Sequence, residues 1–483
     1  MDKKILKNYF YNILYQLFVV ITPFITVPYV TRALGGDALG TSDWTAGIVQ
    51  WFVLFGILGV NIYGNKKIAE VRDDKELMSK TFFEIFVMQF ICMMISGVMY
   101  LLFIQTMKPE VQFYALLQSI SLISVSLDVT WFFYGVEDFK KASIRNMIIK
   151  VLGIILIFTF VKSSNDLGLF ILINAGSGVL GQAIMWFQLR QYITFQKVST
   201  KGVIQHLRPN ILLFVPQIAT SIYTMLDVSM LGYLYDNVAH VSYYQQAQRF
   251  IKMFLFFITS IGAVMLPRIA NMNTKGEEAK AEITRFLQIT LRMALYLAIP
   301  MIVGIITLIP SFIAWFMDAE FQIVAPLIIF TTPIILFISL SNVYGTQYML
   351  PTGMTKEYTK SVVAGAITNA ILNFILMPKY GAFGAIVASV ISEFMVTVVQ
   401  WKYVHNKIDL KIRIKNIYKY ILSSVVMGIV VYTICQVLPP NIFSNFVAIG
   451  SGCLVYFALL TVMKDQFHMN LLHKVLKRGK TNA

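Results

Sequence analysis

Charged residues lie inside long apolar stretches of this sequence, where ionised side chains are rare. A charge near the centre of a bilayer is costly unless it faces protein or water, so such residues mark functional sites or ion pairs between helices. Three lie near the ends of their stretches and are expected to extend toward the membrane surface: Asp43, Glu84 and Lys150. The deeper ones are candidates for a polar cavity, with interhelical ion pairs as the alternative: Asp128, Arg249, Lys252, Arg292 and Glu393.

A polar stripe runs along one of these apolar stretches. Its members recur at intervals of three, four or seven residues, which places them on one face of a helix. They are Asn210, Gln217, Ser221, Thr224 and Asp227. Such a face should avoid lipid, so it contacts either a neighbouring helix or a hydrophilic cavity. A rougher stripe of Asn8, Asn12 and Gln16 in the first stretch favours the cavity.

Enzyme motifs are absent from the sequence. There is no Gly-x-Ser-x-Gly elbow, zinc-protease motif, phosphate-binding loop or paired Cys cluster. The five His residues have no metal-ligand spacing and are expected to be solvated loop residues. We therefore predict a transporter without catalytic residues, metal or cofactor. Without a phosphate-binding loop, uphill transport would depend on an H⁺ or Na⁺ gradient or on a steep substrate gradient.

The composition identifies the elements that must position these residues. Of the 483 residues, 57% are apolar and only 13% are charged, and the mean hydropathy is +0.69. A soluble fold could not hide that much apolar surface, so we predict an all-α polytopic membrane protein. Windows of about 20 residues give about fourteen transmembrane helices. They cover residues 9–33, 41–64, 81–104, 112–134, 147–161, 167–189, 209–231, 241–266, 286–309, 323–346, 359–377, 383–404, 417–437 and 442–463.

The basic residues give these helices an orientation. The sequence has 40 Lys and Arg residues and a net charge of +16. Most of the basic residues fall in every second connection, the pattern expected of cytoplasmic loops. We therefore place both termini in the cytoplasm and attribute the positive charge to topology. Nucleic-acid binding is excluded on the same grounds.

Two parts of the sequence share faint features in the same order. Thr22-Pro23 has a counterpart in Val215-Pro216, and Lys67-Ile68-Ala69 has one in Arg268-Ile269-Ala270. With six helices in each half, the repeat axis would run along the membrane normal, and a substrate cavity would lie between the halves. We predict three parts: a six-helix lobe at 1–205, a second six-helix lobe at 206–405, and two C-terminal helices with a cytoplasmic tail at 406–483.

Several segments resemble one family of membrane proteins. Residues Asp128–Phe139 look like the fourth-helix signature of bacterial polysaccharide flippases of the Wzx type. Four further stretches are similar to that family in the same order: Pro28–Gly36, Asp227–Gly232, Tyr243–Arg249 and Gln347–Gly353. The family belongs to the superfamily that also includes multidrug exporters and lipid II flippases.

The resemblance implies a flippase for an oligosaccharide carried on undecaprenyl diphosphate, which works by alternating access in the bacterial cell membrane. A diphosphate needs cationic partners, and the candidates are Arg32, Arg249, Lys252 and Arg292. Cavity-wall candidates are Asn210, Gln217 and Thr224. Asp128, Asp227 and Glu393 would bind a coupling ion or orient the arginines. Membrane lipids, a polymerase and other glycan-export proteins are the expected partners.

Two other functions remain open at this point. A cation-coupled multidrug exporter of the same superfamily would have a smaller apolar cavity with few arginines. A polytopic polysaccharide polymerase or glycosyltransferase would show a large external loop or an acidic cytoplasmic motif, and neither is evident in the sequence.

Overall fold

The computed structural model describes residues 3–273, 280–408 and 414–481. Within these ranges it does not describe the side chains of 3–10, 12–13, 215–224, 257, 260–268, 414–416 and 474–481. All regular secondary structure in the described part of the chain is helical. The predicted all-α fold class is therefore confirmed.

The chain divides into two compact units, Met1–Ser242 and Tyr243–Ala483. The first unit contains nine α-helices among its described residues: α1 (Lys3–Ile57), α2 (Val60–Val71), α3 (Lys75–Ile104), α4 (Pro109–Ser126), α5 (Thr130–Gly135), α6 (Phe139–Phe160), α7 (Leu167–Leu189), α8 (Thr200–Gln205) and α9 (Leu207–Leu234). Helix α10 (Ala239–Asn273) begins in this unit and continues into the second. The division places α9 with the first unit, and the predicted boundary near residue 205 stays a prediction.

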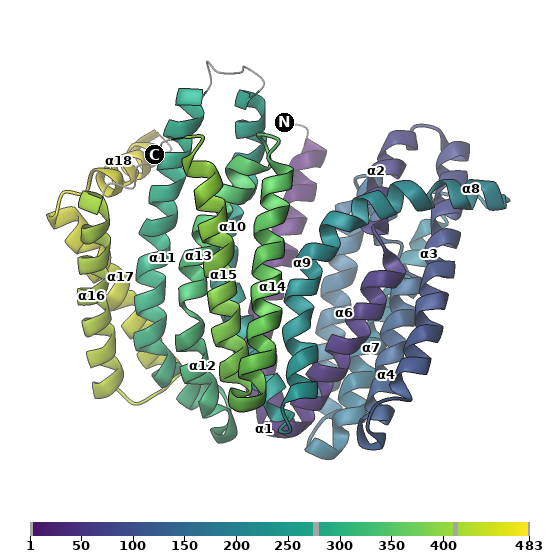
Figure 1. Ribbon diagram of the computed structural model, residues 1–483, viewed down its shortest axis with the longest axis horizontal. Coiled ribbons are helices and arrows are strands. Elements are labelled where there is room, and N and C mark those ends of the chain that lie inside the picture. Colours follow the sequence, from purple (N-terminus) through teal and green to yellow (C-terminus); the bar gives the residue numbers. More distant parts are fainter. Residues whose placement is uncertain (1–2, 274–279, 409–413, 482–483) are drawn as a thin grey trace. The chain divides into compact units, whose positions relative to one another are not determined.

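The remaining described helices belong to the second unit. They are α11 (Lys280–Phe316), the 3₁₀-helix η3 (Ala319–Ile323), α12 (Val324–Thr331), α13 (Pro333–Ser341), the π-helix η4 (Asn342–Met349), α14 (Thr355–Tyr380), α15 (Ala382–His405), α16 (Ile414–Val437), α17 (Ile442–Val462) and α18 (Gln466–Thr481). Helix α14 packs along α15, and α16 packs against both α11 and α17 (Figure 1).

Ten helical segments among the described residues are long and apolar enough to cross a membrane. A pair bent by 43°, residues 319–331 and 333–349, brings the number to eleven if it forms one span. This finding confirms a multi-pass membrane protein, while the count of fourteen stays a prediction. The first two predicted spans fall largely within α1, which is kinked at the non-helical Gly35, whose φ of 74° favours glycine. The second span continues past a break at Leu58–Gly59 into α2.

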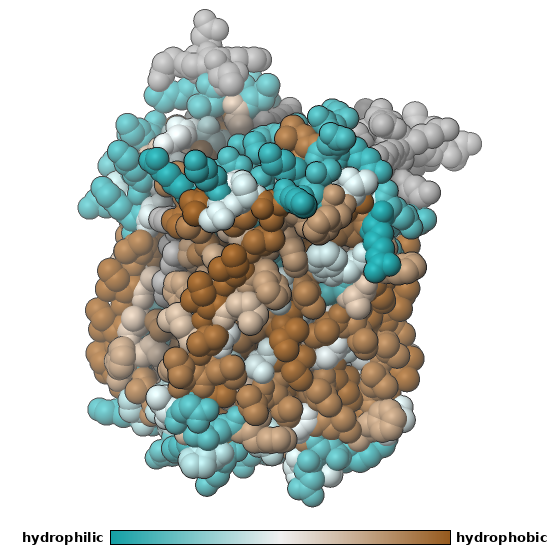
Figure 2. Space-filling view, turned by 90° about the vertical axis from the view of Figure 1, so that its right-hand side faces the viewer, coloured by the Kyte–Doolittle hydropathy of each residue, from teal (hydrophilic) through white to brown (hydrophobic). Residues whose placement is uncertain are grey.

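The first unit is a bundle in which α1 contacts α3, α4 and α6 (Figure 1). Its outer face carries exposed apolar side chains such as Ile95, Leu102 and Ile155. Figure 2 shows a broad apolar band on one face of the molecule, bounded on two sides by hydrophilic residues. An apolar surface of this extent is suited to lipid and would be insoluble in water.

Candidate functional site

The predicted span 112–134 is interrupted in the structure between α4 and α5. Residues Leu127–Val129 leave the α-helix, which frees backbone groups that need partners at membrane depth. Side chains from other helices supply them. The Gln89 side-chain amide donates to the carbonyls of Val125 (2.9 Å) and Asp128 (3.0 Å), and the Trp186 indole donates to the carbonyl of Leu127 (2.9 Å). The interruption is therefore stabilised by specific hydrogen bonds from other helices.

Gln89 also positions the indole ring of Trp131, which follows the interruption. Its Oε1 accepts a hydrogen bond from the Trp131 indole nitrogen at 2.9 Å, and both side chains are buried. Helices α2 and α5 pack closely because Gly64 has no side chain. A Cβ at Gly64 would lie 2.6 Å from the Trp131 ring. These contacts hold α5 against α2 and α3.

Asp128 is half-buried at the interruption, as expected for a residue with a role inside the bundle. Its Oδ1 accepts hydrogen bonds from the backbone N–H of Thr130 (2.8 Å) and from the Gln182 side-chain amide (3.1 Å). The carboxylate therefore accepts from the first N–H of α5 and links this helix to α7.

Arg145 is a buried residue of this site that the sequence analysis missed. The positive-inside pattern assigned it to a cytoplasmic loop, but it lies in α6 with only 7% of its surface exposed. Its Nη2 donates to the Thr130 hydroxyl at 3.0 Å, and its charge interacts with that of Asp128. A Cβ at Gly181 would lie 2.9 Å from Arg145 Nη1, so α7 leaves room for the guanidinium.

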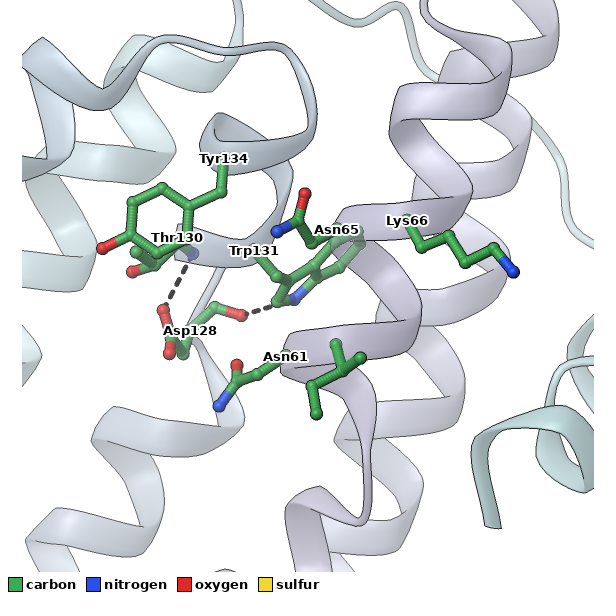
Figure 3. A pocket seen from close by; sticks show the side chains of 8 residues that line it. Asn61, Asn65, Lys66, Asp128, Thr130, Trp131 and Tyr134 are labelled. Atoms are coloured by element: carbon green, nitrogen blue, oxygen red, sulfur yellow. Dashed lines mark hydrogen bonds between the residues drawn. The ribbon is translucent and has the colours of Figure 1, made fainter. Parts of the chain in front are cut away.

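A cavity of about 560 Å³ opens beside this cluster. In Figure 3, Asn61 and Asn65 from α2 and Asp128, Thr130 and Tyr134 from the α4–α5 region surround it. The complete lining is Asn61, Ile62, Asn65, Lys66, Asp128, Thr130, Trp131 and Tyr134. Within the first unit, the structure thus joins Asp128 and its neighbours in the signature Asp128–Phe139 to Asn61 and Asn65 of α2, which no sequence pattern had connected with them.

The other predicted site residues of the first unit have different surroundings. Arg32 is exposed, whereas Asn210 and Asp227 are buried. Asn210 packs against the turn before α2, where a Cβ at Gly59 would lie 3.1 Å from Asn210 Oδ1. Gln217 and Thr224 belong to α9, but their side chains lie outside the described residues. Their predicted role in a cavity wall stays a prediction.

In the second unit, Arg249 and Lys252 are exposed on α10, and Glu393 is half-buried on α15. Arg292 has a defined ion-pair partner. Its Nη2 lies 2.7 Å from the Asp465 carboxylate, and its Nε donates to the Tyr420 hydroxyl at 2.9 Å. For Arg292 this geometry favours the alternative of an ion pair between helices. The pair ties α11 to α16 and to the start of α18.

We predict that Arg292→Gln lowers the free energy of unfolding by about 3–5 kcal/mol, because it leaves the Asp465 carboxylate buried without a cation. The Asp465 side chain is 1% exposed. Thermal denaturation of the purified protein would measure the change. Adding Asp465→Asn should recover part of the loss, since the stranded charge is removed. Strictly additive losses would show that the two residues do not stabilise the fold as a pair.

Two histidines correct the expectation of solvated loop residues: His206 and His468 are both buried. His206 Nδ1 lies 2.6 Å from the Tyr63 hydroxyl, and its Nε2 lies 3.1 Å from Glu84 Oε2. Glu84 is therefore also buried, and the prediction that it extends to the membrane surface is wrong. Burial lowers the pKa of His206, against the opposing effect of Glu84.

His468 is held in the same way in the second unit. Its Nδ1 lies 2.9 Å from the Tyr296 hydroxyl and its Nε2 lies 3.0 Å from the Thr461 hydroxyl. Burial lowers its pKa as well. Both histidines link helices through these hydrogen bonds. Among the described residues, no group of three or more His, Cys, Asp or Glu side chains could hold a metal ion.

The fold and the cavity define a multi-pass helical membrane protein with a polar site inside an apolar bundle. This fold is similar to that of lipid II flippase MurJ in an inward closed conformation, with a TM-score of 0.77 and 18% identity over 97% of this chain and 100% of that chain. A multidrug resistance MATE family transporter in an inward-facing conformation is more distant. Its TM-score is 0.55, with 13% identity over 80% of this chain and 98% of that chain.

The sequence places the chain within this class. The polysaccharide biosynthesis protein family matches residues 5–273, more than half of the chain, and the chain belongs to that family. The model of the lipid II flippase MurJ family matches residues 236–452. The chain is also 25% identical to a putative O-antigen transporter of Shigella dysenteriae, over 79% of this chain and 95% of that protein.

Proposed function

We propose that this protein is a flippase that moves an oligosaccharide linked to undecaprenyl diphosphate from the cytoplasmic to the outer leaflet of a bacterial cell membrane. The observation that carries the proposal is membership of the polysaccharide biosynthesis family over residues 5–273. The similarity to a putative O-antigen transporter over most of both chains supports a glycan substrate. The multi-pass apolar helices and the polar cavity suit the transfer of a hydrophilic group past lipid.

The diphosphate would need cations at a place shielded from lipid. Arg32, Arg249 and Lys252 are proposed for this role because each presents an exposed cationic side chain. Arg292 is less suited because its guanidinium already binds Asp465. Asp128, Asp227 and Glu393 are proposed to bind the coupling ion, H⁺ or Na⁺, or to orient the cations. Both termini are proposed to lie in the cytoplasm, with a polymerase and other glycan-export proteins as partners.

Deletion of the gene tests this function. The expected result is accumulation of one lipid-linked oligosaccharide on the cytoplasmic side and loss of the corresponding surface glycan, both reversed by the wild-type gene. The competing function is multidrug export. A multidrug transporter has a distantly similar fold. Loss of drug resistance without accumulation of a lipid-linked glycan would contradict the proposal and favour multidrug export.

A further inference from the structure

The cavity beside Asp128 has a charge pattern that does not suit a phosphate. Asp128 is the acidic residue of its lining. Lys66 contributes to the wall, but in Figure 3 its side chain extends away from Asp128 and Asn61. The guanidinium of Arg145 lies behind the wall, where it binds Thr130. A diphosphate would therefore meet a carboxylate at close range without a facing cation.

The same wall offers hydrogen bonds to a neutral ligand. Asn61 and Asn65 are one helical turn apart on α2, and both amides lie on the side toward Asp128 in Figure 3. Each amide presents a donor and an acceptor. In the described part of the chain, both hydrogen bonds to the Asp128 side chain end on Oδ1, which leaves Oδ2 available to a ligand hydroxyl.

Two aromatic residues complete the wall. Trp131 and Tyr134 are three residues apart on α5 and line the same cavity. The negative face of an aromatic ring attracts polarised C–H groups. Trp131 is only 1% exposed, so Tyr134 is the residue that offers a ring face. Amides and a carboxylate for hydroxyl groups, next to this ring for a C–H face, match both sides of a sugar ring. The volume of about 560 Å³ lies in the range of small-molecule sites.

We propose that this cavity, which lies within the first unit alone, binds a neutral sugar of the transported oligosaccharide. Asn61, Asn65 and Asp128 would bind its hydroxyl groups, and Tyr134 would contact its C–H face. The proposal rests on the proposed function and adds that two parts of the substrate bind at different places. The sugar binds in this cavity, and the diphosphate binds to cationic side chains outside it.

Photochemical cross-linking in cells tests this assignment with the native substrate. A photoreactive amino acid is placed at the position of Asn65, and in a matched variant at Glu70, an exposed residue of the same helix that does not line the cavity. Both are expressed in the deletion strain. We expect a cross-link between position 65 and the lipid-linked glycan, detected by a glycan stain, and a much weaker one at position 70. Equal labelling at both positions, or labelling at neither, would overturn the proposal.

Substitutions provide an independent measurement that does not depend on the bulky photoreactive group. The double variant Asn61→Leu with Asn65→Leu should reduce glycan export about tenfold or more, because two sets of hydrogen bonds to the sugar are lost. Glu70→Gln, an exposed position on the same helix outside the cavity lining, should stay within about twofold of wild type. Equal export by the double variant and wild type, at equal membrane levels, would overturn the proposal. Failure of the wild-type gene to restore export would instead contradict the proposed function.

Discussion

Replacing Arg145 by Met should reduce glycan export by tenfold or more while the protein still inserts and folds. The guanidinium is buried, donates to the Thr130 hydroxyl and balances the charge of Asp128. A hydrogen bond to a charged group contributes about 1.5–3 kcal/mol, which corresponds to at least a tenfold change if the cavity wall depends on it. Export is measured as the rate at which new glycan reaches the cell surface in the complemented deletion strain.

The fold should tolerate this substitution better than the function does. Burying a guanidinium costs desolvation energy, and an apolar side chain of similar length avoids that cost. The loss of Asp128's neighbouring cation acts in the opposite direction, so the net change in unfolding free energy should be small. Lys140→Met is the matched control, because Lys140 lies on the same helix and is exposed. Normal export by Arg145→Met would remove this residue from the site.

Gln89→Leu should destabilise the protein by about 3 kcal/mol, about 1 kcal/mol for each of the three shortest hydrogen bonds that are lost. The Gln89 amide donates to the carbonyls of Val125 and Asp128, with a longer hydrogen bond of 3.4 Å to that of Ser126, and accepts from the Trp131 indole. Export should fall as well, because Trp131 and Asp128 belong to the cavity wall that Gln89 fixes. Thermal denaturation and the export assay would measure the two effects.

The control for Gln89 lies on the same helix. Gln105, at the end of α3, is exposed and makes one long hydrogen bond of 3.5 Å to the Leu101 carbonyl. Gln105→Leu should change the free energy of unfolding by no more than about 0.5 kcal/mol. Equal stability of both variants would show that the interruption does not need Gln89.

The helical segments could be predicted because a membrane span depends on local composition. The long apolar windows on α3, α6, α15 and α17 all correspond to helices in the structure. The interruption at Leu127–Val129 could not, because the window 112–134 contains no proline or glycine that would mark a break in the helix. The groups that stabilise it, on Gln89 and Trp186, are far away in the sequence and become neighbours only through packing.

Among the residues that line the cavity, the sequence singled out Asp128 as a candidate, and Thr130, Trp131 and Tyr134 only as parts of the signature Asp128–Phe139. A carboxylate inside an apolar stretch is visible in a sequence, because its position is costly without partners. Arg145 follows Lys140 and Lys141 in a basic segment. The positive-inside pattern therefore explained it as a residue of a cytoplasmic loop. Asn61 and Asn65 are neutral, so they carry no such signal. Glu84 and His206 show the same limit, because each becomes buried through its contact with the other.

The central claim is most directly tested with the purified full-length protein in liposomes that contain an undecaprenyl-diphosphate-linked oligosaccharide. Transfer between leaflets can be followed by adding an impermeant glycosidase that removes the sugars exposed outside. The predicted result is cleavage beyond the outer-leaflet fraction with the wild-type protein, and much slower cleavage with Arg145→Met. Cleavage no greater than in protein-free liposomes, by wild-type protein that is folded and reconstituted, would contradict the account.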